Sequence, residues 1–506
     1  MPSIPPLHRL LSALLAPGLL ILGMLEPAQA QVAAPPPPLP APVRPLEPEQ
    51  PFLPQPQTPT PSIVHRQPAQ PAQPPVELTD QDLAGDIKLT ELILNQAMLQ
   101  EDWDTLRRIM RFYPWMRGVD PVLRDYIQGA LLRHDGRLAD AIALYRQLVE
   151  QHPDLDYVRL ELSTMLMEDR QFERSNAELA LLHQRQLSDP AAQHSVEQYR
   201  QALAQQRRWN FRISAGLAYN NNVNSANRDR MLYLPVAAGG WTFWVPFAKG
   251  SDALPKSDWG LKYSGGANVE RNIDGHHYYT LGADIDGVSY QEQRDYSDRT
   301  LTLRGGYKWQ NADIWFSATP QVSQAWMGGR RYSHNHGMAL EYGWRPSPDW
   351  QLMGAWLWLK RKYDDRDYAA YDGHLDILSL TAVRTLSPSL LAFGSLGLQR
   401  ESTTAREYAY RFPWAQLGVV KTFGSTLGAR LSARYGRQSY DQPYALFLNQ
   451  ERRDRELRLD ASLWAPGFTI AGLEPKLNIS YLRITSNLPM YARDRTEVSL
   501  MFEKRF

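Results

Sequence analysis

The spacing of hydrophobic residues divides the chain into four regions. Residues 10–25 are almost continuously apolar, and residues 33–75 show no period. Residues 78–206 carry apolar side chains at every third or fourth position, whereas apolar and polar positions alternate from Trp209 onward. A period near 3.6 is typical of amphipathic helices, and a period of two is typical of strands with two unlike faces. The pattern therefore predicts an all-α domain over 78–206 followed by an all-β domain over 207–506.

The helical region contains an internal repeat. The segment that begins at Asp135 aligns with the segment that begins at Asp169, a shift of about 34 residues, which is the period of tetratricopeptide (TPR) repeats. A generic helical bundle is the alternative. Stacked repeats of this kind form curved surfaces that bind proteins or peptides. The small, turn, small, aromatic and helix-stop positions of the repeat are occupied by Ala130, Gly136, Ala141, Tyr145 and Pro153.

The alternating region predicts about fourteen strands. Segments of roughly ten residues with one apolar and one polar face are the signature of a transmembrane β-barrel, whose outer face meets lipid. A soluble sandwich also alternates, so other features must decide between the two. Short connections such as 310–311 and 424–425 interleave with longer polar loops such as 220–258. This matches the two unequal ends of an outer-membrane barrel.

Aromatic residues point to the same membrane barrel. Rings near strand ends suit the boundary between lipid and water. The chain also closes on an alternating strand with apolar Val498, Leu500, Phe502 and Phe506, which resembles the C-terminal signal read by the outer-membrane assembly machinery. We therefore predict a closed antiparallel barrel, because open sheet edges in lipid would leave backbone groups unsatisfied. The tryptophans toward strand ends are Trp209, Trp309, Trp344, Trp350, Trp414 and Trp464.

The first 77 residues predict export. Residues 1–30 have the weakly basic start, the apolar core and the small–x–small ending, Ala28 and Ala30, of a signal peptide. An N-terminal amphipathic or buried helix is the alternative. Residues 31–77 are rich in proline and poor in apolar side chains, which predicts a disordered, extended linker. We then expect the helical domain in the periplasm and the loop 220–258 outside the cell.

Composition excludes several classes of protein. The 55 Lys and Arg residues nearly balance the 54 Asp and Glu residues, which argues against a basic nucleic-acid-binding face. The absence of cysteine excludes disulfides, thiol catalysis and Cys-ligated metals. The sequence has no phosphate-binding glycine loop, no nucleophile elbow and no H-E-x-x-H motif. We expect no enzymatic activity, no metal and no cofactor.

Some polar clusters could still carry chemistry. The pairs His276–His277 and His334–His336, the second placed in an external loop, lack carboxylates at ligand spacing. Residues 364–367 are most simply a solvated acidic loop. The glycine pairs 265–266 and 305–306 predict places where strands bend. Four basic residues are predicted to face the lumen: Arg212, Lys262, Arg304 and Arg384.

The first long loop, residues 220–258, holds an aromatic cluster of Trp241, Phe243, Trp244 and Phe247. Exposed aromatic clusters are typical of protein-binding surfaces, so one hypothesis is a client-binding loop. The other is a plug or hairpin that folds into the barrel. The sequence leaves both open.

The order of signal peptide, proline-rich spacer, TPR-like helices and fourteen-stranded barrel resembles the surface lipoprotein assembly modulators (Slam). The resemblance implies an outer-membrane translocon for exported clients, either surface lipoproteins or soluble haem- and metal-scavenging proteins. The helical domain would capture the client and the barrel would pass it outward. We expect a monomer whose other partners are outer-membrane lipid and the barrel assembly machinery. The most family-like segments are Val158-Arg159-Leu160-Glu161-Leu162 and Gly216-Leu217-Ala218-Tyr219-Asn220-Asn221-Asn222-Val223-Asn224-Ser225-Ala226.

Two other functions stay open at this point. An exopolysaccharide exporter also joins TPR helices to a C-terminal barrel, but it would carry more repeats and a lumen lined by acidic and aromatic residues. A host-interaction surface protein would act through its extracellular loops. The asparagine run also has a simpler interpretation, because Asn tolerates left-handed backbone conformations where a strand ends.

Overall fold

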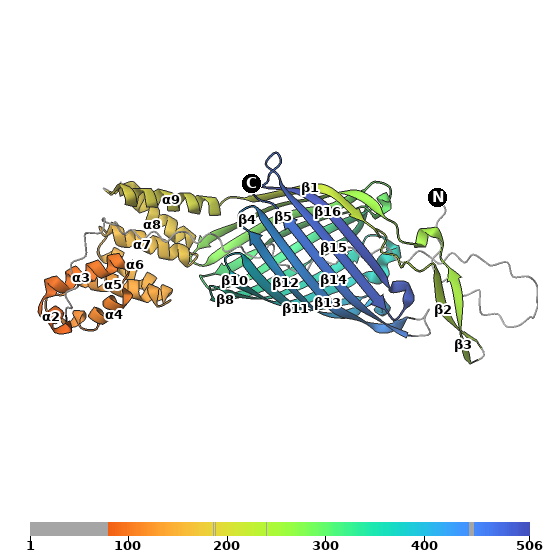
Figure 1. Ribbon diagram of the computed structural model, residues 1–506, viewed down its shortest axis with the longest axis horizontal. Coiled ribbons are helices and arrows are strands. Elements are labelled where there is room, and N and C mark those ends of the chain that lie inside the picture. The colour runs from red at the N-terminus through yellow and green to blue at the C-terminus, as the bar shows by residue number, and fades with distance from the viewer. Residues whose placement is uncertain (1–78, 186, 188, 239, 445–449) are drawn as a thin grey trace, which may run out of the picture.

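The protein consists of a helical domain at one end of a β-barrel and a two-stranded hairpin at the other end (Figure 1). The computed structural model describes residues 79–506 except 186, 188, 239 and 445–449. The predicted signal peptide, residues 1–30, and the predicted linker, residues 31–77, lie outside the described residues. Among the helices of the described residues, none is long and apolar enough to cross a membrane.

Short polar residues cap five of the described helices of the N-terminal domain. Asp86 accepts hydrogen bonds from the backbone amides of Lys88 and Leu89, and Asp120 accepts one from Val122. Such caps satisfy amides that have no partner inside a helix. The described α-helices are α2 (Asp80–Gly85), α3 (Ile87–Gln100), α4 (Trp103–Met110), α5 (Pro121–His134), α6 (Leu138–Gln151), α7 (Asp156–Glu168), α8 (Phe172–Arg185) and α9 (Pro190–Gln206).

The predicted repeat forms the centre of this domain. Gly136 lies in the turn between α5 and α6 with a φ of 76°, a conformation that favours glycine. Tyr145 of α6 is 0% exposed and packs in one cluster with Ala141. Its ring lies against Gly129 of α5, where an added Cβ would be 2.1 Å from Tyr145 Cε1. The closest approach of the two helices is therefore at Gly129, one residue before the predicted small position Ala130.

Fourteen of the described strands close into one antiparallel barrel, as predicted. The closing pair joins β1 to β16, with Arg212 opposite Arg505 and Asn220 opposite Glu497. Both Asn210 and Phe506 lie at the helical-domain end. The barrel strands are β1 (Asn210–Asn220), β4 (Asp258–Asp274), β5 (His277–Tyr290), β6 (Asp298–Gln310), β7 (Ile314–Met327), β8 (Arg330–Ser347), β9 (Trp350–Tyr363), β10 (Gly373–Ser387), β11 (Leu390–Thr403), β12 (Tyr410–Phe423), β13 (Leu427–Tyr444), β14 (Gln450–Trp464), β15 (Glu474–Ser486) and β16 (Arg493–Arg505).

Alternation along each strand separates the outer wall from the lumen. In β12, Phe412 and Gln416 are buried inside the barrel, whereas Leu417 is 71% exposed on the outside. Leu380 and Leu396 on neighbouring strands are 62% and 64% exposed. A continuous apolar outer face of this kind would be unfavourable in water and is the surface that a bilayer covers.

Three orientation predictions were wrong. Trp414 lies inside the barrel beside Phe412, and Trp464 packs against an inward-facing cluster, so neither belongs to a lipid-facing girdle. Arg384 faces outward, where its guanidinium lies 5.1 Å from the centre of the Trp350 ring. Each error has the same cause, because a shift of one residue along a strand moves a side chain to the other face.

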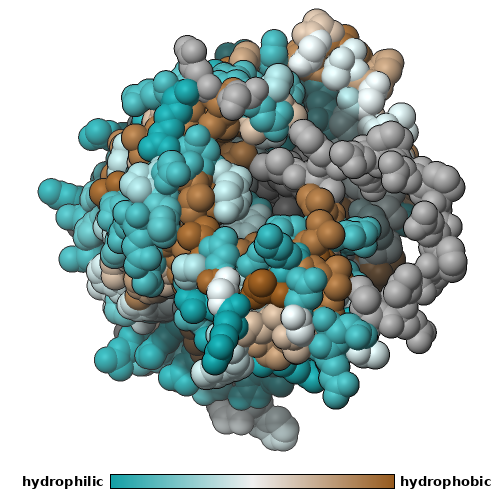
Figure 2. All heavy atoms as spheres, turned by 90° about the vertical axis from the view of Figure 1, so that its left-hand side faces the viewer, coloured by the Kyte–Doolittle hydropathy of each residue, from teal (hydrophilic) through white to brown (hydrophobic). Residues whose placement is uncertain are grey.

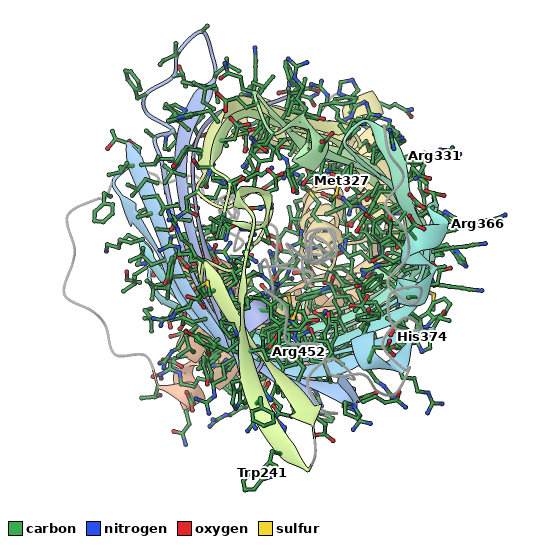
Figure 3. All side chains as sticks on the ribbon, turned by 90° about the vertical axis from the view of Figure 1, so that its right-hand side faces the viewer. Trp241, Met327, Arg331, Arg366, His374 and Arg452 are labelled. Atoms are coloured by element: carbon green, nitrogen blue, oxygen red, sulfur yellow. The ribbon has the colours of Figure 1, made fainter. Side chains whose placement is uncertain are left out.

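The first long loop forms a separate sheet of β2 (Met231–Ala238) and β3 (Trp241–Ala248). Trp241 at its tip is 74% exposed, Phe243 and Trp244 are more than half exposed, and Phe247 is half-buried. Seen from this end of the barrel, the hairpin crosses the front and Trp241 lies beyond the barrel outline (Figure 3). The predicted aromatic cluster thus projects from the far end of the molecule.

Candidate functional site: the barrel lumen and its two ends

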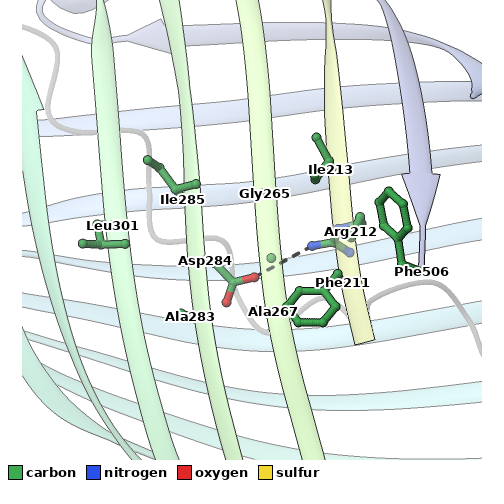
Figure 4. A pocket seen from close by; sticks show the side chains of 11 residues that line it. Phe211, Arg212, Ile213, Gly265, Ala267, Ala283, Asp284, Ile285, Leu301 and Phe506 are labelled. Carbon is green, nitrogen blue, oxygen red and sulfur yellow. Dashed lines mark ion pairs between the residues drawn. The ribbon is translucent and has the colours of Figure 1, made fainter. Parts of the chain in front are cut away.

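Charged side chains pair across one half of the inner wall. Three of the four predicted lumen cations do face inward: Lys262 pairs with Glu497, and Arg304 and Arg212 both approach Asp284. Arg212 Nη2 lies 4.0 Å from Asp284 Oδ1 (Figure 4). Strand β14 adds inward pairs of its own, including Arg434 with Glu456 at 2.7 Å across to β13. This half of the lumen carries many charges, and these acidic and basic side chains form ion pairs with one another.

The opposite half of the inner wall is almost free of charge. Strands β10 and β12 are described from end to end, and none of their inward positions carries an acidic or basic residue. On β9 and β11 the inward charges are Arg361 and Glu401, which pair with each other at 2.7 Å and are each 6% exposed. Some of the remaining positions form two apolar clusters, one around Leu357, Leu375 and Ile377 and one around Val383, Phe393 and Val420. Others carry uncharged polar or aromatic side chains: Ser379, Thr381, Gln399, Gln416, Tyr410, Phe412 and Trp414.

A polar contact fixes the helical domain to the turn between β4 and β5. Arg174 of α8 makes two hydrogen bonds of 2.9 Å to the Asp274 carboxylate, and the amide of Glu173 donates to Asn272 Oδ1 at 2.8 Å. A hydrogen bond of 2.8 Å links His276 Nε2 to Asp169 Oδ2. His276 is thus a docking residue between the two domains, a role that the sequence did not suggest.

Two of the other histidines that the sequence singled out bond to separate partners in the structure. His277 bonds to the Tyr307 hydroxyl at 2.6 Å, and His334 bonds to Asp364 at 3.1 Å. Strand β8 extends further than predicted and takes in both His334 and His336. Across the described residues, no group of three or more His, Asp or Glu side chains is placed to hold a metal ion.

The asparagine run after β1 closes the barrel at the hairpin end. Asn222 is 1% exposed, accepts from the amide of Ala226 and donates to the carbonyls of Ala226 and Asp494, all at 2.8 Å. Asn227 donates to the carbonyls of Pro489 and Ala492 at 2.7 Å. Only Ser225 in this run has a positive φ. The asparagines therefore act through their side chains, which tie the first loop to the last, rather than through left-handed backbone.

A buried carboxylate lies inside the helical repeat. Tyr126 donates to Glu161 Oε1 at 2.6 Å, and Tyr145 donates to the carbonyl of Tyr126 at 2.9 Å. Burial raises the pKa of Glu161, although these hydroxyl donors oppose the shift. Arg159, two residues earlier in the same helix, pairs with Glu178 and is 7% exposed. The segment 158–162 is therefore a packing unit between repeats.

The surface at the helical end differs from the barrel wall. Viewed from that end, most of the molecule is hydrophilic, with scattered apolar patches (Figure 2). Trp115, between α4 and α5, is 86% exposed. On the outer barrel wall, a cavity of about 480 Å³ is bordered by Phe211, Ile213 and Phe506 and floored by small residues such as Gly265 and Ala267 (Figure 4).

Comparison with known proteins identifies both domains. Residues 209–506 match the family described as surface lipoprotein assembly modifier, and residues 76–179 match its N-terminal TPR repeats. The chain belongs to this family. It is 25% identical over 439 residues to surface lipoprotein assembly modifier 1 of Haemophilus influenzae, covering 85% of this chain and 87% of the relative. It is 26% identical over 441 residues to surface lipoprotein assembly modifier 1 of Neisseria meningitidis, covering 85% and 86%.

A third relative has a different name from the first two. The hemophilin secretion modulator of Acinetobacter baumannii is 25% identical over 448 residues, covering 85% of this chain and 87% of the relative. Membership of the family and the closed fourteen-stranded barrel make this an outer-membrane protein with an N-terminal helical domain. The helical domain then lies on the periplasmic side, and the hairpin β2–β3 lies on the extracellular side.

Proposed function

We propose that this protein delivers specific exported proteins from the periplasm to the cell surface. The observation that carries the proposal is the docking of a TPR domain on the periplasmic turn of a closed barrel, through Arg174, Asp274 and His276. A repeat domain that binds proteins is thereby held at the lower opening of a transmembrane lumen. The relatives named as lipoprotein assembly modifiers and as a hemophilin secretion modulator support the same function.

In this mechanism the helical domain binds a client and presents it to the barrel. The client crosses through the lumen or along an opened seam and folds outside, and this folding gives the transfer its direction. No covalent step is required, so the protein acts without catalytic residues, metal or cofactor. It works as a monomer in outer-membrane lipid, after insertion by the assembly machinery that recognises the outward-facing Val498, Leu500, Phe502 and Phe506.

After it leaves the barrel, the client contacts the aromatic hairpin. Trp241, Phe243 and Trp244 stand exposed at the extracellular end, where an emerging polypeptide first meets the outside. The exopolysaccharide alternative is less well supported, because the inner wall of β9 to β12 carries a single acidic side chain, Glu401, which is buried in an ion pair with Arg361. A surface protein that acts only through its loops would not need a helical domain docked in the periplasm.

The proposal is tested by deleting residues 78–206 while keeping the export signal and the barrel. An exported lipoprotein that carries an epitope tag, expressed with this protein as the candidate client, is followed by surface labelling of whole cells. We expect surface display to be lost while the amount of folded barrel stays the same. Unchanged display would contradict the proposed role of the helical domain. Replacing loop 220–258 alone separates the host-interaction function, which would be lost without any change in export.

A further inference from the structure

The outer wall of the barrel has a depression beside the seam where β1 meets β16. Its volume is about 480 Å³, within the range of roughly 300–1,000 Å³ that is typical of sites for small ligands. Gly265 and Ala267 of β4 and Ala283 of β5 form its floor (Figure 4). The depression exists because these three neighbouring outward positions carry small residues. Other outward positions of the same three strands carry leucines that are 46–52% exposed: Leu261, Leu281 and Leu303.

The backbone of β4 at this point is covered by side chains on the inside only. Gly266 faces the lumen, where an added Cβ would lie 2.8 Å from Asp284 Oδ1 and 3.7 Å from Arg212 Nη2. Gly265 faces outward, and an added Cβ there would lie 3.3 Å from Ile285 Cγ2. The outer side of this stretch is therefore left to the bilayer. Hydrocarbon fills such a hollow, because an empty one would lose its van der Waals contacts on one side.

Aromatic residues place the lower edge of the depression near the periplasmic boundary of the membrane. Phe211 and Phe506 line this edge and pair across the seam through backbone hydrogen bonds of 3.0 and 3.3 Å. Trp209 stacks on Phe211, with 6.2 Å between the ring centres. Aromatic rings of this kind mark the level at which hydrocarbon gives way to lipid headgroups. Lipid that enters the depression therefore comes from the periplasmic leaflet.

The row of paired residues that crosses the depression climbs toward the centre of the membrane. Ile213 of β1 is paired, through β4 and β5, with Leu301 of β6. Ile213 is the fourth residue from the periplasmic end of β1, whereas Leu301 is the fourth residue from the extracellular end of β6. Three strand spacings of about 4.8 Å and a strand tilt of about 40° give a rise of about 9 Å. One leaflet contributes about 15 Å to the hydrocarbon core, so the depression lies at the depth of its acyl chains.

Two basic side chains lie on the same outward face, toward the periplasm. Lys504 is paired opposite Ile213, and its Nζ lies 4.9 Å from the centre of the Phe506 ring. Arg271 follows further along β4, on the outward face that Ala267 also occupies. Positive charge thus borders an apolar hollow, as an anionic headgroup above an acyl chain requires. The acidic residues next to these two cations face the lumen and pair there with other basic residues: Glu503 with Arg505 and Glu270 with Lys308.

We propose that the depression is a binding site for one anionic phospholipid of the periplasmic leaflet. An acyl chain lies over Gly265 and Ala267, and the phosphate is held at the level of Lys504 and Arg271. The bound lipid covers the bare backbone of β4 beside the seam and so adds to the stability of the closed barrel. This inference goes beyond the proposed function, because it concerns the outer surface of the barrel and needs no client.

The test uses the purified full-length protein in detergent, titrated with phosphatidylglycerol or phosphatidylcholine of equal chain length, and native mass spectrometry counts the bound lipids. We expect one phosphatidylglycerol to bind about twentyfold more tightly than phosphatidylcholine, because each of two basic residues contributes about a factor of five. Lys504→Gln and Arg271→Gln should each lower the affinity for phosphatidylglycerol about fivefold. Lys421→Gln is the matched control, an outward cation at the periplasmic end of β12 across the barrel, and should leave the affinity unchanged.

Filling the depression tests the acyl-chain half of the site. The double variant Ala267→Leu with Ala283→Leu should lower the affinity for either lipid about tenfold, because the new side chains take the place of about two methylene groups of the lipid. Ala415→Leu makes a similar change at an exposed outward position of β12 and should have no effect. Cross-linking of phosphatidylglycerol that carries a diazirine in one acyl chain should label β1, β4 and β5 in the unmodified protein and not in the double variant.

Three results would overturn the lipid site. The first is equal binding of the two lipids, and the second is unchanged binding in the double alanine variant. The third is displacement of phosphatidylglycerol by a lower concentration of a triacylated lipopeptide, because the depression would then hold the anchor of a lipoprotein. The circular dichroism signal of the barrel shows that each variant is folded, and if Lys504→Gln fails to fold, Arg271→Gln takes its place. Failure here contradicts the lipid site and not the delivery function, which the deletion of 78–206 tests.

Discussion

Replacing Gly129 with Ala is predicted to destabilise the helical domain, although Ala favours helices. Gly129 lies inside α5, where Ala lowers the free energy of a helix by about 1 kcal/mol relative to Gly. The structure places the Tyr145 ring where the new methyl group would go, with Cε1 only 2.1 Å from the ideal Cβ. Steric repulsion and helix propensity therefore act in opposite directions at this one position.

The repulsion should exceed the gain in propensity. Overpacking a buried site costs about 1–3 kcal/mol. Tyr145 is 0% exposed and its hydroxyl is bonded to the Tyr126 carbonyl, so the ring cannot move away easily and the upper end of that range applies. The net effect is a loss of about 2 kcal/mol after the gain of about 1 kcal/mol is subtracted. For a domain of this size the melting temperature should fall by about 6–10 °C.

The assay is thermal melting of the full-length protein in detergent, followed by the helical circular dichroism signal. Gly136→Ala is the matched control, because its φ of 76° is strained but nothing lies within 4 Å of the new methyl group. We expect a smaller loss there, about 1 kcal/mol. In a Tyr145→Leu background Gly129→Ala should become neutral or stabilising. A stabilised Gly129→Ala in the unmodified protein would refute the packing of Tyr145 on α5.

Three further changes test other parts of the structure. Because burial raises the pKa of Glu161 in the folded state, the stabilising contribution of this carboxyl is present at low pH and is lost as the pH rises through the folded-state pKa; Glu161→Gln should therefore gain stability relative to the unmodified protein as the pH rises above the ordinary glutamate pKa of about 4.3, measured by melting at a series of pH values. Asn222→Ala removes three hydrogen bonds from a buried site and should cost about 2–4 kcal/mol of local stability. This loss should be seen as faster protease cleavage in residues 223–257. Asn487→Ala, at an exposed site, should leave that cleavage rate unchanged. Phe506→Ser should reduce the amount of folded barrel in the outer membrane several-fold, while Phe423→Ser, an outward aromatic residue at the same end, should reduce it less; equal losses would argue against a special role for the chain end.

The fold could be predicted because its causes are local. An alternating pattern follows directly from strands with lipid on one side and the lumen on the other, and the short turns and long loops set the order of the strands. The face to which a side chain points was harder to predict near strand ends. Trp414, Trp464 and Arg384 were each assigned to the wrong face there. Aromatic and basic side chains occur on both faces there, so residue type alone does not fix the register.

The contacts that define the candidate site could not be predicted for a different reason. His276 meets Asp169 and Asn222 meets Asp494, and each pair joins residues that are far apart in the chain. No periodicity links such partners, because the closure of the barrel and the docking of the domain bring them together. The asymmetry of the lumen is an intermediate case. It is present in the alternation of β10 and β12, but it becomes visible only when the inward residues of neighbouring strands are placed side by side.

Reconstitution tests most directly whether the protein carries a client across the membrane. Purified protein is inserted into liposomes with the helical domain on the outside, and a folding-competent lipoprotein, the candidate client, is added to the same side. We expect that a fraction of the client becomes protected from external protease, and that this fraction falls to the background of empty liposomes when residues 78–206 are removed. Client that binds to the liposomes but stays fully accessible to protease would contradict delivery across the membrane.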